Sequence, residues 1–374
     1  MRGNMGSETT PSKTASQAEH SDLLSSLLFE FKRNKLILYF IAITTPLTLL
    51  TSLLVPHKLV YDIYTYLEAL AIISYVSFVL WATYFYFHML FTREQKPAIK
   101  FLNKLKTLLC PISKPVSFII LMVSLNVAFS NYTFLKSLIP YFNHYAFDLD
   151  FYYLDKWLHF GFSPWEVTHY LFPGALSSLV ISALYNLWFF LMWGMLLFFV
   201  IDRKNELLRN QFLLTFLSSW LVIGNVVATL LSSAGPAFFH HFESLDAYAQ
   251  LMQRLESQSE YLSEQGLLPL WMLSTQDMLW ENYIDGVIIK GSGISAMPSL
   301  HVTIAVLMAM TAFKLNKKLG YVAWVYTFII QIGSVHLAWH YAVDGYVGAL
   351  CVVILWHLIG YLLRRNHQSI TQHQ

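Results

Sequence analysis

Long apolar stretches alternate with short polar segments through most of the chain. A helix needs about 20 mostly apolar residues to cross a membrane, and eight stretches reach or approach that length. The pattern therefore predicts an all-α integral membrane protein with about eight transmembrane helices, of which the sixth is short. They cover roughly residues 36–55, 67–91, 116–139, 176–201, 211–234, 299–314, 319–339 and 343–363.

Composition supports a membrane protein. Of the 374 residues, 56% are hydrophobic and only 12% are charged, and the mean hydropathy is +0.49. A soluble domain carries about 25% charged residues. Two cysteines are too few for a disulfide framework, and the net charge of +2 by itself identifies no partner.

The lysine and arginine positions predict how the chain is oriented, because cytoplasmic loops carry an excess of these residues. With the N-terminus inside, all but five of the 24 lysines and arginines fall in cytoplasmic segments. We therefore expect a multi-pass protein with both termini in the cytoplasm. Arg203, Lys204 and Arg209 then form a cytoplasmic anchor rather than a phosphate clamp. The five outer cations are Lys58, Lys136, Lys156, Arg254 and Lys290.

Four regions follow from this pattern. Residues 1–34 are polar and rich in Ser and Thr, which is typical of a disordered cytoplasmic tail. Residues 35–115 hold two extra transmembrane helices and a basic loop, 116–363 a six-helix catalytic membrane domain, and 364–374 a second cytoplasmic tail. The stretch 243–265 has amphipathic spacing and could cover the site, lie on the membrane or form a solvated surface helix.

Ionisable residues gather at the outer ends of the last three predicted spans. Ser299 and His301 begin the sixth span, and His340 and Asp344 lie around the start of the eighth. The alternating direction of the spans brings all four residues to one membrane face. Such residues are costly at membrane depth and are therefore functional candidates.

Their spacing predicts phosphoryl transfer through a phosphohistidine. His340 and Asp344 are four residues apart and share a helix face, so the carboxylate can fix the imidazole tautomer and leave the other nitrogen as a nucleophile. His301 could protonate a leaving alkoxide. The start of the sixth helix favours an anion, to which the Ser299 hydroxyl can add a hydrogen bond.

Two motifs resemble the second and third signature motifs of the type 2 phosphatidic acid phosphatase superfamily. They are Pro298-Ser-Leu-His301 and His340-Tyr-Ala-Val-Asp344. Segments 293–301, 233–236 and 150–161 are more similar to the inositol phosphorylceramide synthase-like, or inositolphosphotransferase, branch of that superfamily.

The resemblance covers roughly residues 145–350. It implies a phosphatidic acid phosphatase type 2-like core made of the last six spans, with no metal and no other cofactor. It also implies roles for four residues: His340 as nucleophile, Asp344 as its orienting carboxylate, His301 as acid and Ser299 as phosphate ligand.

Two departures remove cations that the superfamily usually carries. Its first motif holds a lysine and an Arg-Pro pair where this chain has Ala234-Gly-Pro236, and its third motif has an arginine where this chain has Ser334. Because phosphoryl transfer needs charge stabilisation, other groups must substitute. We name His336 and Lys290 as candidate substrate-binding residues and Lys156 as a third. A structural role for His336 and a solvated Lys290 stay open.

Two outer segments offer weaker candidates. Backbone N–H groups around Gly235 could approach the phosphate, although we prefer a plain turn. Asp148, Asp150 and Asp155 could orient a headgroup, but we favour an acidic loop that is solvated or caps a helix.

We therefore predict a membrane lipid phosphatase or phosphotransferase that acts on a lipid phosphate or phospholipid, with its site on the periplasmic, extracellular or lumenal side. An inositol phosphorylceramide synthase-like headgroup transferase is an alternative. A transporter would carry more mid-span ionisable residues, and a non-catalytic lipid-binding protein is a further alternative. Expected partners are the bilayer and a lipid substrate, with no nucleic acid. The sequence leaves substrate, acceptor and oligomeric state open.

Overall fold

A computed structural model describes residues 13–55 and 59–372. All regular structure within these residues is helical, as the apolar pattern predicts. Seven of the described helices are long and apolar enough to cross a membrane, and the short sixth predicted span is the 16-residue apolar helix α14. The long apolar segments are α1 (Lys13–Ser52), α2 (Leu67–Phe91), α4 (Ser113–Ser137), α8 (Ala175–Ile201), the continuous run α9 (Glu206–Ser218), η1 (Ser219–Val227) and α10 (Ala228–Leu230), α14 (Leu300–Leu315), α15 (Lys317–His336) and α16 (Ala342–Gln372).

Shorter helices fill the connections. The basic loop after α2 contains one, and the two long connections, between α4 and α8 and between α10 and α14, contain the others. Most of the predicted amphipathic stretch is helical, and its apolar face packs on the protein, since Leu251, Leu255 and Leu262 are buried. Gln258 of the same helix accepts a hydrogen bond from Ser178 of α8. The shorter helices are α3 (Pro97–Leu109), α5 (Ile139–Phe142), α6 (Asp148–Leu158), α7 (Pro164–Leu171), η2 (Pro236–Phe238), α11 (Phe239–Phe242), α12 (Ala249–Glu264) and α13 (Trp271–Asp285).

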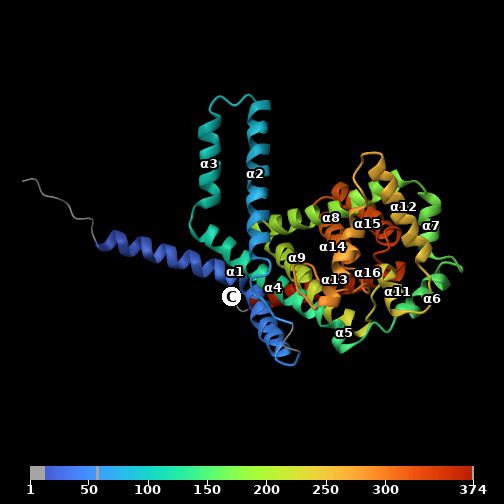
Figure 1. The fold of residues 1–374 in the computed structure, drawn as a ribbon. Helices are drawn as coiled ribbons and strands as arrows, with labels where there is room; N and C mark the ends of the chain where they lie inside the picture. Colours follow the sequence, from blue (N-terminus) through green and yellow to red (C-terminus); the bar gives the residue numbers. More distant parts are fainter. Residues whose placement is uncertain (1–12, 56–58, 373–374) are drawn as a thin grey trace, which may run out of the picture.

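The last six predicted spans form one bundle, and α2 stands beside it as a hairpin with α3 (Figure 1). Burial separates the two groups. The most apolar stretch of α4 is 72% buried, whereas that of α2 is 6% buried and therefore faces lipid. Ten of the 16 residues of α14 are buried, because α8, α9, α15 and α16 all pack on it. The helix that begins at Ser299 thus lies in the interior of the bundle.

The two regions that we predicted as cytoplasmic tails contain helix. Helix α1 begins at Lys13, within the 1–34 segment for which we expected disorder, and residues 1–12 lie outside the described residues. Helix α16 likewise continues through the expected tail to Gln372. Neither segment contains glycine or proline next to its span. Adding a residue to an existing helix costs little, so the spans extend into polar sequence.

Candidate functional site

The candidate site forms where three connecting segments meet at one end of the bundle. The N–H of Ala296 donates to Ser233 O at 2.9 Å, and the N–H of Ser299 donates to Asp344 O at 3.0 Å. Gly235 makes this packing feasible. Its φ is +94°, and a Cβ there would lie 2.7 Å from Cβ of Ala296. A side chain at this position would push the three segments apart.

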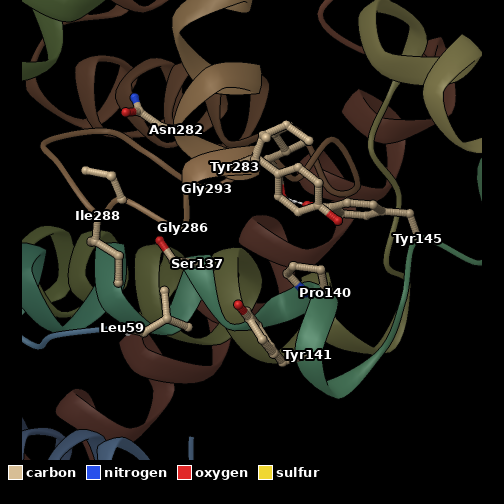
Figure 2. Close-up of a pocket in the computed structure, with 13 residues that line it drawn as sticks. Leu59, Ser137, Pro140, Tyr141, Tyr145, Asn282, Tyr283, Gly286, Ile288 and Gly293 are labelled. Atoms are coloured by element: carbon tan, nitrogen blue, oxygen red, sulfur yellow. Dashed lines mark hydrogen bonds between the residues drawn. The ribbon is translucent and has the colours of Figure 1, made fainter. Parts of the chain in front are cut away.

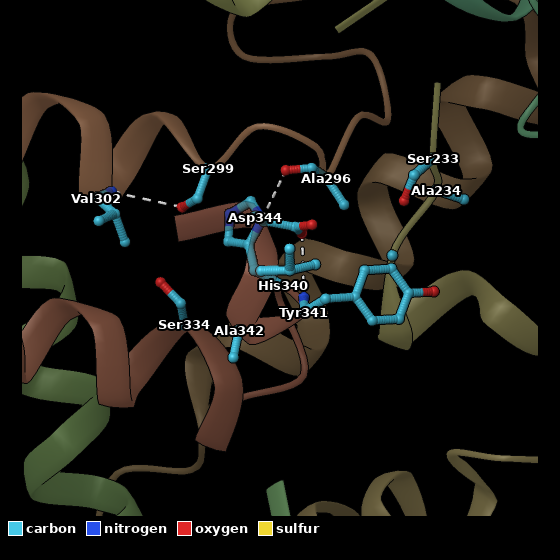
Figure 3. A network of polar contacts seen from close by, with 12 residues as sticks. Ser233, Ala234, Ala296, Ser299, Val302, Ser334, His340, Tyr341, Ala342 and Asp344 are labelled. Atoms are coloured by element: carbon cyan, nitrogen blue, oxygen red, sulfur yellow. Dashed lines mark hydrogen bonds and ion pairs between the residues drawn. The ribbon is translucent and has the colours of Figure 1, made fainter. Parts of the chain in front are cut away.

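His340 lies at this meeting point as a neutral imidazole with a defined tautomer (Figure 3). Its Nδ1 lies 2.9 Å from Ala296 O and 3.2 Å from Oδ2 of Asp344. A carbonyl oxygen can only accept, so Nδ1 carries the proton and Nε2 has a free lone pair. Burial lowers the pKa of His340 to about 3, and the Lys136 charge acts in the same direction. The ring is therefore uncharged at neutral pH, as a nucleophile requires.

The start of α16 positions Asp344. Residues Ala342, Val343 and Asp344 form its first turn, and Oδ2 of Asp344 accepts from the N–H of Tyr341 at 3.1 Å. An acidic side chain at the third helical position commonly reaches back to the residue that caps the helix. The same oxygen meets His340, so one local motif fixes both partners. His340 and Asp344 are thus in contact, although His340 precedes α16 and does not share a helix with Asp344.

His301 faces the same centre from the first turn of α14. Its ring centroid lies 6.2 Å from that of His340. Tyr185 stacks on it at 4.6 Å and Trp188 packs at 4.4 Å. The two aromatic rings of α8 hold the imidazole, which makes no hydrogen bond to any described side chain or backbone group. Its ring nitrogens are thus available to a ligand.

Ser299 caps α14. Its Oγ accepts from the N–H of Val302 at 3.4 Å, and its backbone N–H is bound to α16. A serine at this position satisfies one of the open N–H groups of a helix start. The hydroxyl proton remains available to an anion. The helix therefore begins at Leu300 beside both histidines.

Asp148 binds and fixes the short segment, residues 233–235, that precedes η2. Its carboxylate accepts from Oγ of Ser233, from the N–H groups of Ala234 and Gly235, and from the hydroxyl of Tyr341, all at 2.7–2.9 Å. The N–H groups that we considered for the phosphate are therefore already occupied. The structure agrees with a plain turn, held by a buried carboxylate.

Asp155 has a comparable role at α16. It accepts from the N–H groups of Ala342 at 2.7 Å and Val343 at 2.9 Å. Burial raises the pKa of Asp155 to about 6. The capping interpretation is thus right for Asp148 and Asp155, but solvation is wrong for both, and only Asp150 is exposed among the three. Seven residues separate Asp148 from Asp155, a spacing that puts both on one face of α6.

His336 and Lys290, the sequence candidates for substrate binding, contact other groups. Nε2 of His336 lies 2.8 Å from Oγ of Ser178, and its ring stacks on His169 at 3.8 Å. Lys290 pairs with Glu68 of α2 at 2.9 Å. Neither forms a hydrogen bond with the His340 centre among the described residues. Both assignments stay predictions without support from these contacts.

The basic cluster lies near the end of α8. Arg209 is fully buried, with Nε donating to Phe199 O at 2.9 Å and Nη2 to Asn34 Oδ1 at 2.7 Å. Arg203 pairs with Glu30 of α1. The site contacts the middle of α8, where Tyr185 and Trp188 pack on His301, whereas Phe199 is close to the end of this helix. The structure therefore separates these cations from the site.

This architecture is that of a multi-pass membrane protein with a buried His–Asp pair and a second histidine at one end of its bundle. Residues 149–358 match the family model described as the PAP2 superfamily. The match covers more than half of the 374 residues, and the chain belongs to this superfamily. No curated protein and no solved structure matches the chain. Membership supports a phosphatase-like function on lipid phosphates.

Proposed function

We propose that this protein is a lipid phosphatase or phosphotransferase that works through a phosphohistidine on His340. The observation that carries the proposal is the hydrogen bond from Nδ1 of His340 to Ala296 O, with Asp344 beside it. Because Nδ1 holds the proton of the neutral ring, the lone pair is on Nε2, and the centroid of the His301 ring lies 6.2 Å from that of His340. Nucleophile, orienting carboxylate and acid are thus within one small volume, which is the arrangement that nucleophilic catalysis requires.

In the proposed reaction, Nε2 of His340 attacks the phosphorus of a lipid phosphate. The bond from phosphorus to the ester oxygen breaks, and protonated His301 gives its proton to the leaving alkoxide. Phosphorylation makes the His340 ring cationic, and Asp344 stabilises that charge. Water then attacks phosphorus and passes a proton to His301, the phosphorus–nitrogen bond breaks, and phosphate leaves. Both histidines return to their starting states.

The start of α14 supplies part of the phosphate site in this proposal. Ser299 has a free hydroxyl proton, and the positive end of a helix dipole favours an anion. An anion between the rings also favours the protonated form of His301. The excess of lysine and arginine at the opposite end of the bundle supports an active site on the outer membrane face.

A large cavity beside one of the three segments that meet at the site supports a second candidate reaction, transfer to an alcohol. It measures about 990 Å³, and Pro236, Gln276 and Trp280 contribute to its lining. Pro236 directly follows Gly235, which packs on Ala296. An alcohol bound in this cavity would replace water in the second step, as in the inositol phosphorylceramide synthase-like branch.

Phosphate release from a panel of lipid phosphates tests the proposal, with detergent-purified wild type beside His340→Ala. Loss of a catalytic nucleophile lowers turnover by about 1000-fold or more, so release by the variant should fall to background. His88→Ala is the matched control, because His88 is an exposed histidine of α2. Equal release by His340→Ala would contradict the mechanism. Release that requires added inositol or diacylglycerol would identify the transferase.

A further inference from the structure

Lys136 is a charged side chain of the bundle without a protein partner. It lies in the last turn of α4 and is partly buried. Its ammonium forms no hydrogen bond or ion pair with the described residues. The ammonium is therefore available to bind an anion. The chain also lacks the cations that its superfamily usually places around phosphate.

The helix face that carries Lys136 is turned toward the start of α14. Tyr132 lies one turn earlier on that face. A Cβ on Gly224 of η1 would lie 2.8 Å from Cε2 of Tyr132 and 2.7 Å from Cδ1 of Leu300. Tyr132 and Leu300 therefore meet at the same point of η1. Lys136 is one turn closer to the end of α4, and Leu300 directly precedes His301.

The segment that leads to Ser299 covers the stem of Lys136. Gly293 has a φ of +90°, and a Cβ there would lie 3.2 Å from Cγ of Lys136. Three residues later, Ala296 accepts the hydrogen bond from His340. Burial and, to a smaller extent, the Lys136 charge lower the pKa of His340. Contact thus brings the stem of Lys136 against the segment that carries Ala296 and Ser299.

A cavity of about 320 Å³ opens against this part of the structure (Figure 2). Ser137, the neighbour of Lys136, lines it together with Gly293 and Ile294. The segment from Gly293 to Ser299 therefore runs from the cavity to the candidate site.

We propose that Lys136 is the phosphate-binding cation of this site and acts together with Ser299 and the start of α14. It comes from the first helix of the six-helix core, whereas the lysine of the superfamily's first motif lies at the end of the third. A cation from a different helix would thus occupy the same place around the phosphate. This inference rests on the proposed function, because it assumes that the site binds a phosphoryl group.

Equilibrium binding of inorganic orthovanadate to the full-length protein in detergent tests the assignment. Charge-assisted hydrogen bonds to a bound anion predict about 10- to 100-fold weaker binding in Lys136→Met. Lys136→Arg should bind within about threefold of wild type, because it keeps a cation at the same place. Arg254→Met is the control for the loss of one outer positive charge. Lys136→Gln replaces the methionine variant if the latter does not purify as a folded protein.

The outcomes separate this inference from the proposed function. Weaker vanadate binding by Lys136→Met, with recovery in Lys136→Arg, supports Lys136 whether or not lipid phosphates are turned over. Equal affinities in wild type and Lys136→Met overturn it, as does the absence of vanadate binding by wild type. If turnover is detected, kcat/KM of Lys136→Met should also fall about 100- to 1000-fold, the range for loss of one charge-stabilising group.

Discussion

Two polar clusters along α8 differ in how completely their charges are paired. In the first, near the end of α8, Arg33 pairs with Glu206 at 3.1 Å and Arg203 pairs with Glu30. Arg209 donates to backbone and side-chain oxygens. Every cation of this cluster, which we call the inner cluster, has an oxygen partner. The second cluster is the candidate site, which contacts α8 at Trp188, 11 residues before Phe199, so about 17 Å of helix lies between the two contacts.

The charged and polar atoms of the site cluster are incompletely paired. Nε2 of His340, both ring nitrogens of His301 and the ammonium of Lys136 have no protein partner among the described residues. Asp344 keeps one carboxylate oxygen unpaired. Native proteins satisfy almost all buried polar groups. In the inner cluster, Nη1 of Arg33 and Oε2 of Glu30 lack hydrogen bonds but form an ion pair at 3.5 Å, whereas the buried Asp344 oxygen lacks even that. The comparison therefore assigns stability to the inner cluster and chemistry to the site cluster.

Asp344→Asn should give the largest effect of the variants that probe this contrast. The amide can preserve the volume and the bond from Tyr341, but it no longer stabilises a positive His340 ring. Replacing the carboxylate of a His–carboxylate pair by an amide lowers kcat by about 10⁴ in a well-studied case, so we expect a loss of about 10²- to 10⁴-fold. Single-turnover phosphate release measures it.

Asp150→Asn is the matched control, since this aspartate is exposed. Its rate and melting temperature should equal those of wild type. A kcat for Asp344→Asn within threefold of wild type would show that the carboxylate only holds the helix start. The assignment of chemistry to the site cluster would then be contradicted.

Arg209→Met should act in the opposite way and reduce stability without changing the reaction. The substitution leaves Phe199 O and Asn34 Oδ1 buried without their donor. Loss of such hydrogen bonds costs about 2–4 kcal/mol in unfolding free energy. Thermal denaturation in detergent reports this, and Lys204→Met, an exposed neighbour, should change little. A slower chemical step in folded Arg209→Met protein would contradict the assignment of the inner cluster to stability alone.

The membrane architecture and the core of the site could be predicted from the sequence for physical reasons. Apolar length alone identifies a span, and a four-residue spacing places His340 beside Asp344. The phosphate ligands were harder to assign, because Lys290 and His336 find partners from α2 and α8 that are distant in sequence. Such pairings depend on tertiary packing, which local patterns do not encode.

The sequence position of Lys136 also points to a functional role. It is one of the five lysines and arginines that depart from the cytoplasmic bias, and it sits inside the last turn of a predicted span rather than in a loop. A cation at that depth is costly. The roles of the acidic residues of α6 were harder to predict from the sequence. Asp148 and Asp155 accept hydrogen bonds from backbone N–H groups of segments more than 80 residues away.

Asp155→Asn should give the smallest effect of these variants, and that effect is on how the stability of the protein depends on pH. The pKa of Asp155 is raised from an ordinary value of 3.8 to about 6, so between these values the folded chain holds a proton that the unfolded chain has lost. The stability that this proton contributes is present below about pH 4, falls as pH rises and is lost above about pH 6.

A two-unit shift corresponds to roughly 3 kcal/mol at most, and we expect melting temperatures of wild type in detergent to fall across this window. Asp155→Asn should flatten that slope, because the amide does not titrate yet can still accept one N–H at the start of α16. Asp150→Asn should keep the slope of wild type. An unchanged slope in Asp155→Asn would mean that the site cluster, like the inner cluster, holds its carboxylates charged. The difference between the two clusters would then rest on the histidines and Lys136 alone.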